Sequence, residues 1–185
     1  MRTYLASRGV KLFEEIRKDK LGDSSMTFFD PEGHSMEIVQ YREDGLAGQS
    51  KGKFMPASRV ATHFDHAGVL FNDIEPAIQF YSDFLGLRPD RGPRLTFLAT
   101  GDPLDRLEIG TAKQPRSPER FGIKNHICLS SPDAVKAVEM LTSKRISRKY
   151  RPVEAHLLGG KHVANYYDPD GTRVELMEPG ATDKR

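Results

Sequence analysis

The sequence contains very little cysteine and no tryptophan. Its single cysteine, Cys128, rules out a disulfide within the chain and excludes a zinc site built from cysteines. Long hydrophobic runs are also missing: no segment approaches the length of a transmembrane helix, and the N-terminal residues lack the apolar core of a signal peptide. We therefore expect no membrane partner and, by default, a cytoplasmic location.

A large excess of charge of one sign is absent as well. The 28 Lys and Arg residues nearly balance the 26 Asp and Glu residues, for a net charge of +2. This balance gives no electrostatic reason to expect a nucleic-acid partner. With 37% hydrophobic and 29% charged residues in a chain of 185, the composition is that of a globular protein with one sizeable core or two small domains.

The sequence does contain a repeated segment. Nearly the same letters occur near the start and near the end of the chain, as FFDPEGHSMEIVQY (28–41) and YYDPDGTRVELMEP (166–179). In each copy an Asp-Pro pair starts a turn, and Gly33 or Gly171 suits the positive-φ position that ends it. An alternating strand follows, so each copy predicts a β-hairpin. Each strand carries a glutamate, Glu37 or Glu175, seven residues after the Asp that opens the turn.

A strand and a helix precede the second copy. Residues 124–130 alternate like a strand, and Ser131 followed by Pro132 predicts the N-cap and first turn of a helix. A matching unit lies at 64–87, where a strand over 64–71 leads into a helix that is capped by Asp73 or Asn72 and closed by Gly86.

Two short strands follow this first helix, joined by a degenerate copy of the Asp-Pro turn. In that copy Glu108 lies six residues after Asp102, one fewer than in the other two. The order of elements predicts an α+β protein of tandem β-α-β-β-β modules. We divide the chain into three parts: the C-terminal half of a module (1–42), a linker with no apolar period (43–60), and two paired modules (61–179, made of 61–112 and 123–179).

Four residues of the two complete modules have side chains that can bind a metal ion. His66 and His126 lie on the first strands, and Glu108 and Glu175 lie on the last strands. A glutamate within an apolar strand is costly to bury without a compensating cation. Imidazole and carboxylate ligands together suit Zn, Ni, Fe, Co or Mn. The alternative is that each glutamate faces solvent and that each histidine is an ordinary, partly buried strand residue.

Tandem modules with a histidine on the first strand and a glutamate on the last resemble the vicinal oxygen chelate superfamily. This group includes glyoxalase I, methylmalonyl-CoA epimerase, extradiol dioxygenases and the fosfomycin and bleomycin resistance proteins. The most specific part of the resemblance is HICL together with YYDPDGTRVELMEP. It implies curved mixed sheets around a cup that holds one divalent metal ion (Zn, Ni, Mn or Fe(II)), with His66, Glu108, His126 and Glu175 as ligands.

The resemblance also implies a range of functions. Two His and two Glu ligands are most similar to the glyoxalase and epimerase branch, whose metal polarises two neighbouring oxygens of a small substrate and stabilises an enediolate-like species. Glu175 is then the expected catalytic base, because its motif is intact. An Fe(II) extradiol dioxygenase would need only His66, His126 and Glu175. A non-catalytic binding protein of the bleomycin-resistance kind is a third alternative, so we leave open whether the chain is a lyase or isomerase, an oxidoreductase or no enzyme.

For three further residues we expect no part in the metal site. Glu37 lacks a histidine strand of its own and is expected to face solvent, His63 is expected at the surface, and Cys128 is expected to be buried filler. Because the sequence begins inside a module, we expect either a late start or a truncated form of a longer four-module protein, in which an upstream export signal would change the location. The half module would expose strand edges, for which homodimerisation is one remedy.

Overall fold

The computed structural model describes residues 1–13, 15–18, 20, 22–91, 96–101, 105–112, 125–144, 153–158, 160–168 and 172–180. Asp102 and Gly171, which were assigned to two of the turns, lie outside the described residues. The chain forms two compact units, Met1–Ser58 and Arg59–Arg185. In the described part of the chain, no helix is long and apolar enough to cross a membrane.

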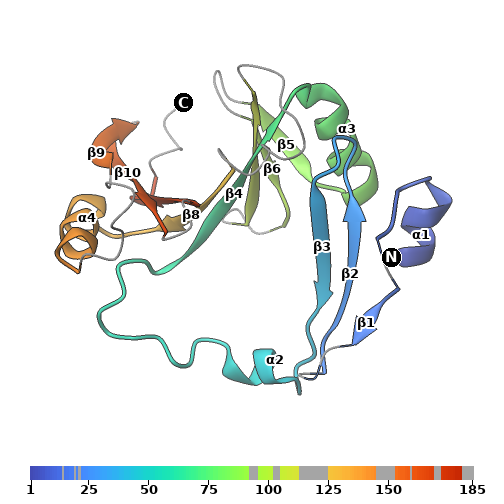
Figure 1. Cartoon of the computed structure of the whole chain (residues 1–185), viewed down its shortest axis with the longest axis horizontal. Helices are drawn as coiled ribbons and strands as arrows, with labels where there is room; N and C mark the ends of the chain where they lie inside the picture. The colour runs from blue at the N-terminus through green and yellow to red at the C-terminus, as the bar shows by residue number, and fades with distance from the viewer. Residues whose placement is uncertain are drawn as a thin grey trace. The chain divides into compact units, whose positions relative to one another are not determined.

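The N-terminal unit is a small antiparallel sheet with short helices. Its elements are α1 (Arg2–Ser7), β1 (Arg17–Lys18), β2 (Ser24–Phe29), β3 (Ser35–Gln40) and α2 (Leu46–Ser50). The strands follow the order β1-β2-β3, and β2 and β3 form the long hairpin seen in Figure 1. The turn has the expected chemistry: Asp30 Oδ1 accepts hydrogen bonds from the amides of Glu32 and His34, and Gly33 adopts a φ of +88°. This hairpin was therefore predicted from the sequence.

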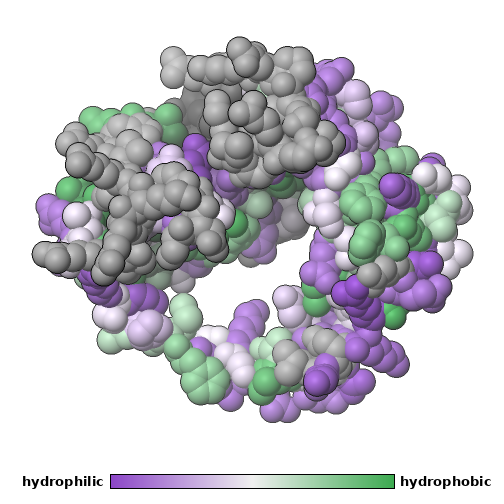
Figure 2. Space-filling view, in the orientation of Figure 1, coloured by the Kyte–Doolittle hydropathy of each residue, from purple (hydrophilic) through white to green (hydrophobic). Residues whose placement is uncertain are grey.

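The core of the N-terminal unit is small. Leu5, Met26 and Phe28 are buried, whereas Phe54 is 89% exposed and other apolar side chains also remain at the surface. Figure 2 accordingly shows apolar and hydrophilic residues interspersed over the visible face of the molecule. Glu37 is exposed on β3, opposite Thr27 of β2. The prediction that Glu37 faces solvent is confirmed.

The C-terminal unit contains two β-α-β-β-β modules in one sheet. The elements of the first are β4 (His63–Phe71), α3 (Ile74–Leu85), β5 (Arg88–Arg91), β6 (Thr96–Ala99) and β7 (Arg106–Thr111). Those of the second are β8 (His126–Ser130), α4 (Ala134–Ser143), β9 (Val153–Leu158), β10 (Lys161–Tyr167) and β11 (Arg173–Met177). The strand order is β5-β6-β7-β4-β8-β11-β10-β9. Figure 1 shows β4 and β8 between the helices α3 and α4 of the two modules. The expected α+β architecture of tandem modules in a curved mixed sheet is therefore observed.

The two modules meet through their first strands. Within each module the first and last strands are parallel (β4 with β7, β8 with β11), and β4 pairs antiparallel with β8. This pairing places the first and last strands of both modules at the centre of the sheet, which is where a site shared by the modules can form.

Each helix packs on strands of its own module, α3 on β5, β6 and β7 and α4 on β9, β10 and β11. Asp73 caps α3 by accepting from the Glu75 amide, and Gly86 closes it at a φ of +71°, both as expected. Ala134 and Ala137 of α4 pack with Ala164 and Leu176. One expectation is wrong: Ser131 does not cap α4. Its hydroxyl donates to the Val60 carbonyl, and Asp133 is the N-cap, accepting from the Lys136 amide, so the helix begins two residues later than expected.

Candidate metal centre

The strand register brings the four predicted ligands together on one face of the sheet, here called the histidine face (His66, Glu108, His126 and Glu175). Gly68 of β4 lies opposite both Glu108 of β7 and His126 of β8. Cys128 of β8 lies opposite both His66 of β4 and Glu175 of β11. Because residues two apart along a strand share a face, this register puts both histidines and both glutamates on the same side. The arrangement repeats from one module to the other, with Gly68 and Cys128 in equivalent places.

Ligating atoms of His66, Glu108 and His126 all lie within 4.8 Å of one another, and a Glu175 oxygen lies close to both histidines. His66 Nε2 is 3.2 Å from His126 Nε2, 3.3 Å from Glu108 Oε2 and 3.6 Å from Glu175 Oε2. His126 Nε2 is 3.7 Å from the same Glu175 oxygen. His66 is completely buried, and the other three side chains are largely buried.

These separations fit a single metal ion. With metal–ligand bonds of about 2.1 Å, neighbouring ligand atoms stand about 3.0 Å apart in an octahedron and about 3.4 Å apart in a tetrahedron. The distances among His66, His126 and Glu108 that are given above, 3.2 and 3.3 Å, lie within this range, and those to the Glu175 oxygen, 3.6 and 3.7 Å, lie slightly above it. Two imidazole nitrogens and two carboxylate oxygens suit Zn, Ni, Mn or Fe(II) alike, so the donor set does not select one of these ions.

The electrostatics of the face separates its two carboxylates. Burial opposes ionisation of Glu108, but hydrogen bonding and charge attraction from His66 outweigh it and lower the pKa of Glu108. At Glu175 burial dominates, and the nearby Glu108 adds to it, so the pKa of Glu175 is raised. Burial would lower the pKa of His66, yet hydrogen bonds to Asp65 and Glu108 raise it to about 9. Without a metal ion, these neighbours therefore favour the protonated form of the His66 ring.

Asp65 is a buried residue behind His66 that the sequence analysis did not identify. A register shift between Phe64 and His66 interrupts the pairing of β4 with β8, and both Asp65 and His66 are buried as a result. Asp65 Oδ1 lies 2.8 Å from His66 Nδ1 and 2.6 Å from Arg106 Nη2, and Ser130 Oγ donates to Asp65 Oδ2 at 3.3 Å. Strict alternation along β4 would place Asp65 on the face opposite to His66. The sequence pattern therefore did not indicate a contact between Asp65 and His66.

An arginine lies two residues before each of the two glutamates of the histidine face. In the sequence this reads as RLE at 106–108 and RVE at 173–175. Arg106 bonds to Asp65, and its guanidinium lies 4.5 Å from the centre of the Phe97 ring, which in turn packs edge-on against His66. Arg173 Nη2 contacts His126 Nδ1 directly. The repeated R-x-E pattern in the sequence could have identified both arginines as neighbours of the predicted ligands.

Gly68 leaves the space that the His126 ring occupies. A Cβ atom added at Gly68 would lie 1.9 Å from His126 Cε1 and 2.2 Å from Nδ1. No side chain fits there while His126 keeps its position, so this glycine is required for the meeting of the two imidazoles over the central strands.

Two other features are weaker candidates. Asp65, His66 and Cys128 also offer ligating atoms close together. Burial, followed by the nearby carboxylates, raises the pKa of the Cys128 thiol, so the thiolate that a metal needs is disfavoured. The prediction of Cys128 as buried filler agrees with its complete burial.

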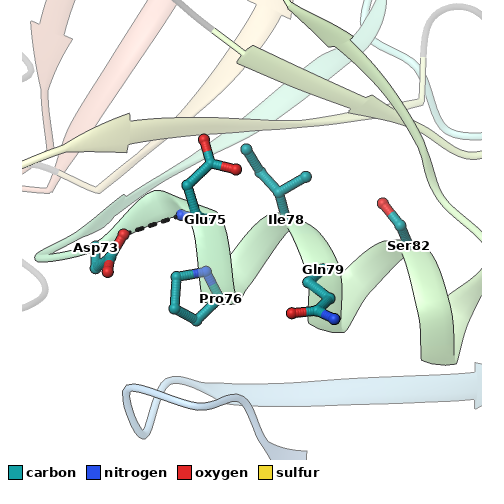
Figure 3. A pocket seen from close by; sticks show the side chains of 6 residues that line it. All are labelled: Asp73, Glu75, Pro76, Ile78, Gln79 and Ser82. Carbon is teal, nitrogen blue, oxygen red and sulfur yellow. Dashed lines mark hydrogen bonds between the residues drawn. The ribbon is translucent and has the colours of Figure 1, made fainter.

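The second feature is a depression along the start of α3, lined by Asp73, Glu75, Pro76, Ile78, Gln79 and Ser82 (Figure 3). It contains no imidazole, and the Asp73 carboxylate is already bonded to the Glu75 amide.

The sequence profile of the Glyoxalase/Bleomycin resistance protein/Dioxygenase superfamily matches residues 63–176. The match covers more than half of the chain, and the chain therefore belongs to this superfamily. A search among curated proteins gives no match.

Solved structures share the fold at low sequence identity. The Mn(II)-bound glyoxalase from Novosphingobium aromaticivorans aligns with a TM-score of 0.69 at 18% identity, over 96% of this chain and 57% of that chain. The 2,3-dioxygenase LapB from Pseudomonas sp. KL28 aligns with a TM-score of 0.64 at 13% identity, over 95% of this chain and 65% of that chain. Methylmalonyl-CoA epimerase from Mycobacterium tuberculosis aligns with a TM-score of 0.53 at 20% identity, over 68% of this chain and 93% of that chain.

The likeness to these structures shows the fold, which occurs with at least three reactions. The chain spans 57% of the length of the glyoxalase and 65% of that of the dioxygenase. The choice among activities therefore depends on the residues of the histidine face.

Proposed function

We propose that the C-terminal unit binds one divalent metal ion through His66, Glu108, His126 and Glu175 and catalyses proton transfer next to a carbonyl of a small oxygenated substrate. The observation that supports this most strongly is the clustering of the His126 imidazole and of both carboxylates around His66 Nε2, at 3.2 to 3.6 Å. The bound ion would act as a Lewis acid on substrate oxygens.

Glu175 is the residue that takes the proton in this proposal. Its pKa is raised by burial and by the neighbouring Glu108, whereas the pKa of Glu108 is lowered. A pair of carboxylates whose environments separate their pKa values is the usual basis for dividing the roles of proton acceptor and fixed charge. Glu175 accepts the proton from the substrate carbon, and the electron pair of the broken C–H bond moves toward the carbonyl oxygen. Glu108 stays ionised.

Asn165 is a candidate contact for the substrate. It lies on β10 directly opposite Glu175, and its Oδ1 is buried without a hydrogen-bond partner among the described residues. Burying such an oxygen costs free energy unless a ligand or a water molecule donates a hydrogen bond to it. We assign it to orienting the substrate beside Glu175.

The dioxygenase alternative is favoured less by the geometry. An Fe(II) centre with two His and one Glu would leave Glu108 without a role. Yet Glu108 Oε2 is closer to His66 Nε2, at 3.3 Å, than Glu175 Oε2 is, at 3.6 Å. Four groups at similar distances favour the four-ligand set of a lyase or isomerase.

The test is elemental analysis of protein purified without chelators, together with a His66→Ala, Glu175→Ala double variant. We expect close to one equivalent of metal in the parent and none in the variant. Oxygen-sensitive iron would instead support the dioxygenase alternative. A parent that holds no metal and takes up none of Zn, Ni, Mn or Fe(II) would contradict the metal site and leave a metal-free binding protein.

A further inference from the structure

The two histidines of the proposed centre have opposite neighbours at Nδ1. His66 Nδ1 faces the carboxylate of Asp65 at 2.8 Å, whereas His126 Nδ1 faces the guanidinium of Arg173. The residues that precede the two histidines also differ: one is an aspartate and the other an asparagine. Asp65 turns toward His66, but Asn125 Oδ1 accepts a hydrogen bond from the Leu70 amide at 3.1 Å. The repeated modules therefore treat two equivalent imidazoles differently.

The neighbour at Nδ1 decides which ring nitrogen has its lone pair available. A carboxylate that already accepts from Arg106 and Ser130 can only accept, so the proton of a neutral His66 ring resides on Nδ1 and Nε2 is free to bind a metal. A guanidinium can only donate, so a neutral His126 ring in contact with Arg173 would carry its proton on Nε2. His126 must change tautomer and leave Arg173 before its Nε2 can serve as a ligand.

From this asymmetry, and on the basis of the proposed metal centre, we infer that Asp65 is a positioning residue that directs Nε2 of His66 at the ion once that ring is neutral, whereas His126 joins the ion only after it leaves Arg173. Asp65 contacts none of the other predicted ligands in the interactions described for it, so it acts through His66. Its own position is fixed by the interruption of β4 pairing and by Arg106, which lies between Asp65 and the Phe97 ring. Carboxylates in this place orient a histidine and increase its basicity toward a metal.

The first experiment identifies the ligating nitrogens in the wild-type protein. Ring-¹⁵N NMR of the Zn(II)-loaded chain is expected to show His66 bound through Nε2, with an Nδ1–H that is protected from exchange by Asp65. Ligation through Nδ1 of His66, or an Nδ1–H that exchanges as fast as in a free imidazole, would overturn the inference. This measurement does not depend on any variant.

The second experiment measures Zn(II) affinity by competition with a chromophoric chelator. Asp65→Asn keeps the side-chain shape but removes the carboxylate, and we expect the affinity to fall by about 10- to 100-fold. Asn125→Ala is the matched control, because it changes the corresponding residue of the other module, and its affinity is expected to stay close to that of the wild type. The NMR signal of the His66 Nδ1–H should lose its protection in Asp65→Asn and keep it in Asn125→Ala.

The possible failures are distinguishable. A wild-type chain that binds no Zn(II) contradicts the proposed function itself. A wild-type chain that binds Zn(II) through His66 Nε2, with an Asp65→Asn variant of unchanged affinity and unchanged Nδ1–H protection, contradicts the positioning role alone. Thermal unfolding of the metal-free variants separates either result from loss of the fold.

Discussion

Glu37 and Glu175 occupy the same place in two copies of one hairpin, yet their surroundings differ completely. Both lie seven residues after the Asp of an Asp-Pro turn, on the second strand of an antiparallel pair. Glu37 is exposed on β3, which pairs with β2 and forms the edge of the three-stranded sheet among the described strands. Glu175 is buried on β11, between β10 and β8, with His66 and His126 within 4 Å of its carboxylate. The hairpin motif therefore predicts a strand and a turn, and the parallel histidine strand beside it determines whether the glutamate can be a ligand.

The largest effect is expected from neutralising these two glutamates separately. Glu175→Gln keeps the size of the side chain but removes the charge of a predicted ligand. We expect the metal affinity to fall by more than about 100-fold, which exceeds the loss expected when a residue that only orients a ligand is changed. Glu37→Gln is the matched control and should leave the affinity unchanged, because Glu37 is exposed. Isothermal titration with Zn(II) measures both. Equal losses of metal affinity in Glu175→Gln and Glu37→Gln would show that the different surroundings of the two glutamates do not decide which one binds metal.

The next largest effect is expected from pH, which changes the protonation of His66, the histidine close to Glu175. The pKa of His66 is raised to about 9 in the metal-free protein, so below that pH the ring must lose a proton before Nε2 can bind an ion. The apparent metal affinity should therefore rise by about tenfold per pH unit between about pH 6 and pH 8. Competition titrations in non-coordinating buffers measure this slope. A flat profile would mean that His66 is neutral before the metal arrives.

A smaller effect is expected when the His126 ring is displaced by a substitution at a neighbouring residue and His126 itself is unchanged. In Gly68→Ala the new methyl group would overlap the His126 ring, so the ring must move. We expect a loss of about 1–3 kcal/mol in stability together with a weaker metal site. Gly110→Ala is the control: its Cβ would meet only the end of the Leu70 side chain, at 2.7 Å, which can turn aside. Urea unfolding and Zn(II) titration of both variants check the difference. A Gly68→Ala variant with wild-type affinity would mean that the position of the ring is not essential.

The smallest effect is expected from another glutamate of the same segment. Glu178 accepts hydrogen bonds from the amides of Ala134 and His162, which tie α4 and β10 to the end of β11. In Glu178→Gln each oxygen–amide contact weakens or is lost, at a cost of about 1 kcal/mol. The metal affinity should not change. Urea unfolding measures the first quantity and Zn(II) titration the second; a large drop in affinity would show that Glu175 is not special among the glutamates of this strand end.

Local chemistry explains why much of the fold could be predicted from the sequence. The Asp30 turn with Gly33, the Asp73 cap and the Gly86 closure each follow from the conformational preferences of one or two residues, and the module order follows from the repeat. Ser131 was assigned to a cap because serine before proline is a common start, but the helix begins after Asp133. Serine and aspartate are both good N-caps, and only the packing of the preceding chain on Val60 distinguishes them here.

The site was predictable in its four ligand positions and not in its supporting residues. The structure places His66, Glu108, His126 and Glu175 together, and their service as ligands stays a prediction until metal is measured. Asp65 was missed because a break in strand pairing cannot be read from alternation. The role of Gly68 was missed because it depends on which strand of the other module lies opposite it. Both are consequences of register between segments far apart in the chain.

The close approach of His66 and His126 has a consequence for a chain with only one cysteine. These residues are 60 positions apart in the sequence, and their Nε2 atoms are 3.2 Å apart. An ion held by both would act as a reversible cross-link across that loop, and the chain-entropy model gives a covalent link over such a span a stabilisation of about 4 kcal/mol. The protein would gain much of what a disulfide provides, in a form that chelators and protons, rather than reductants, can undo.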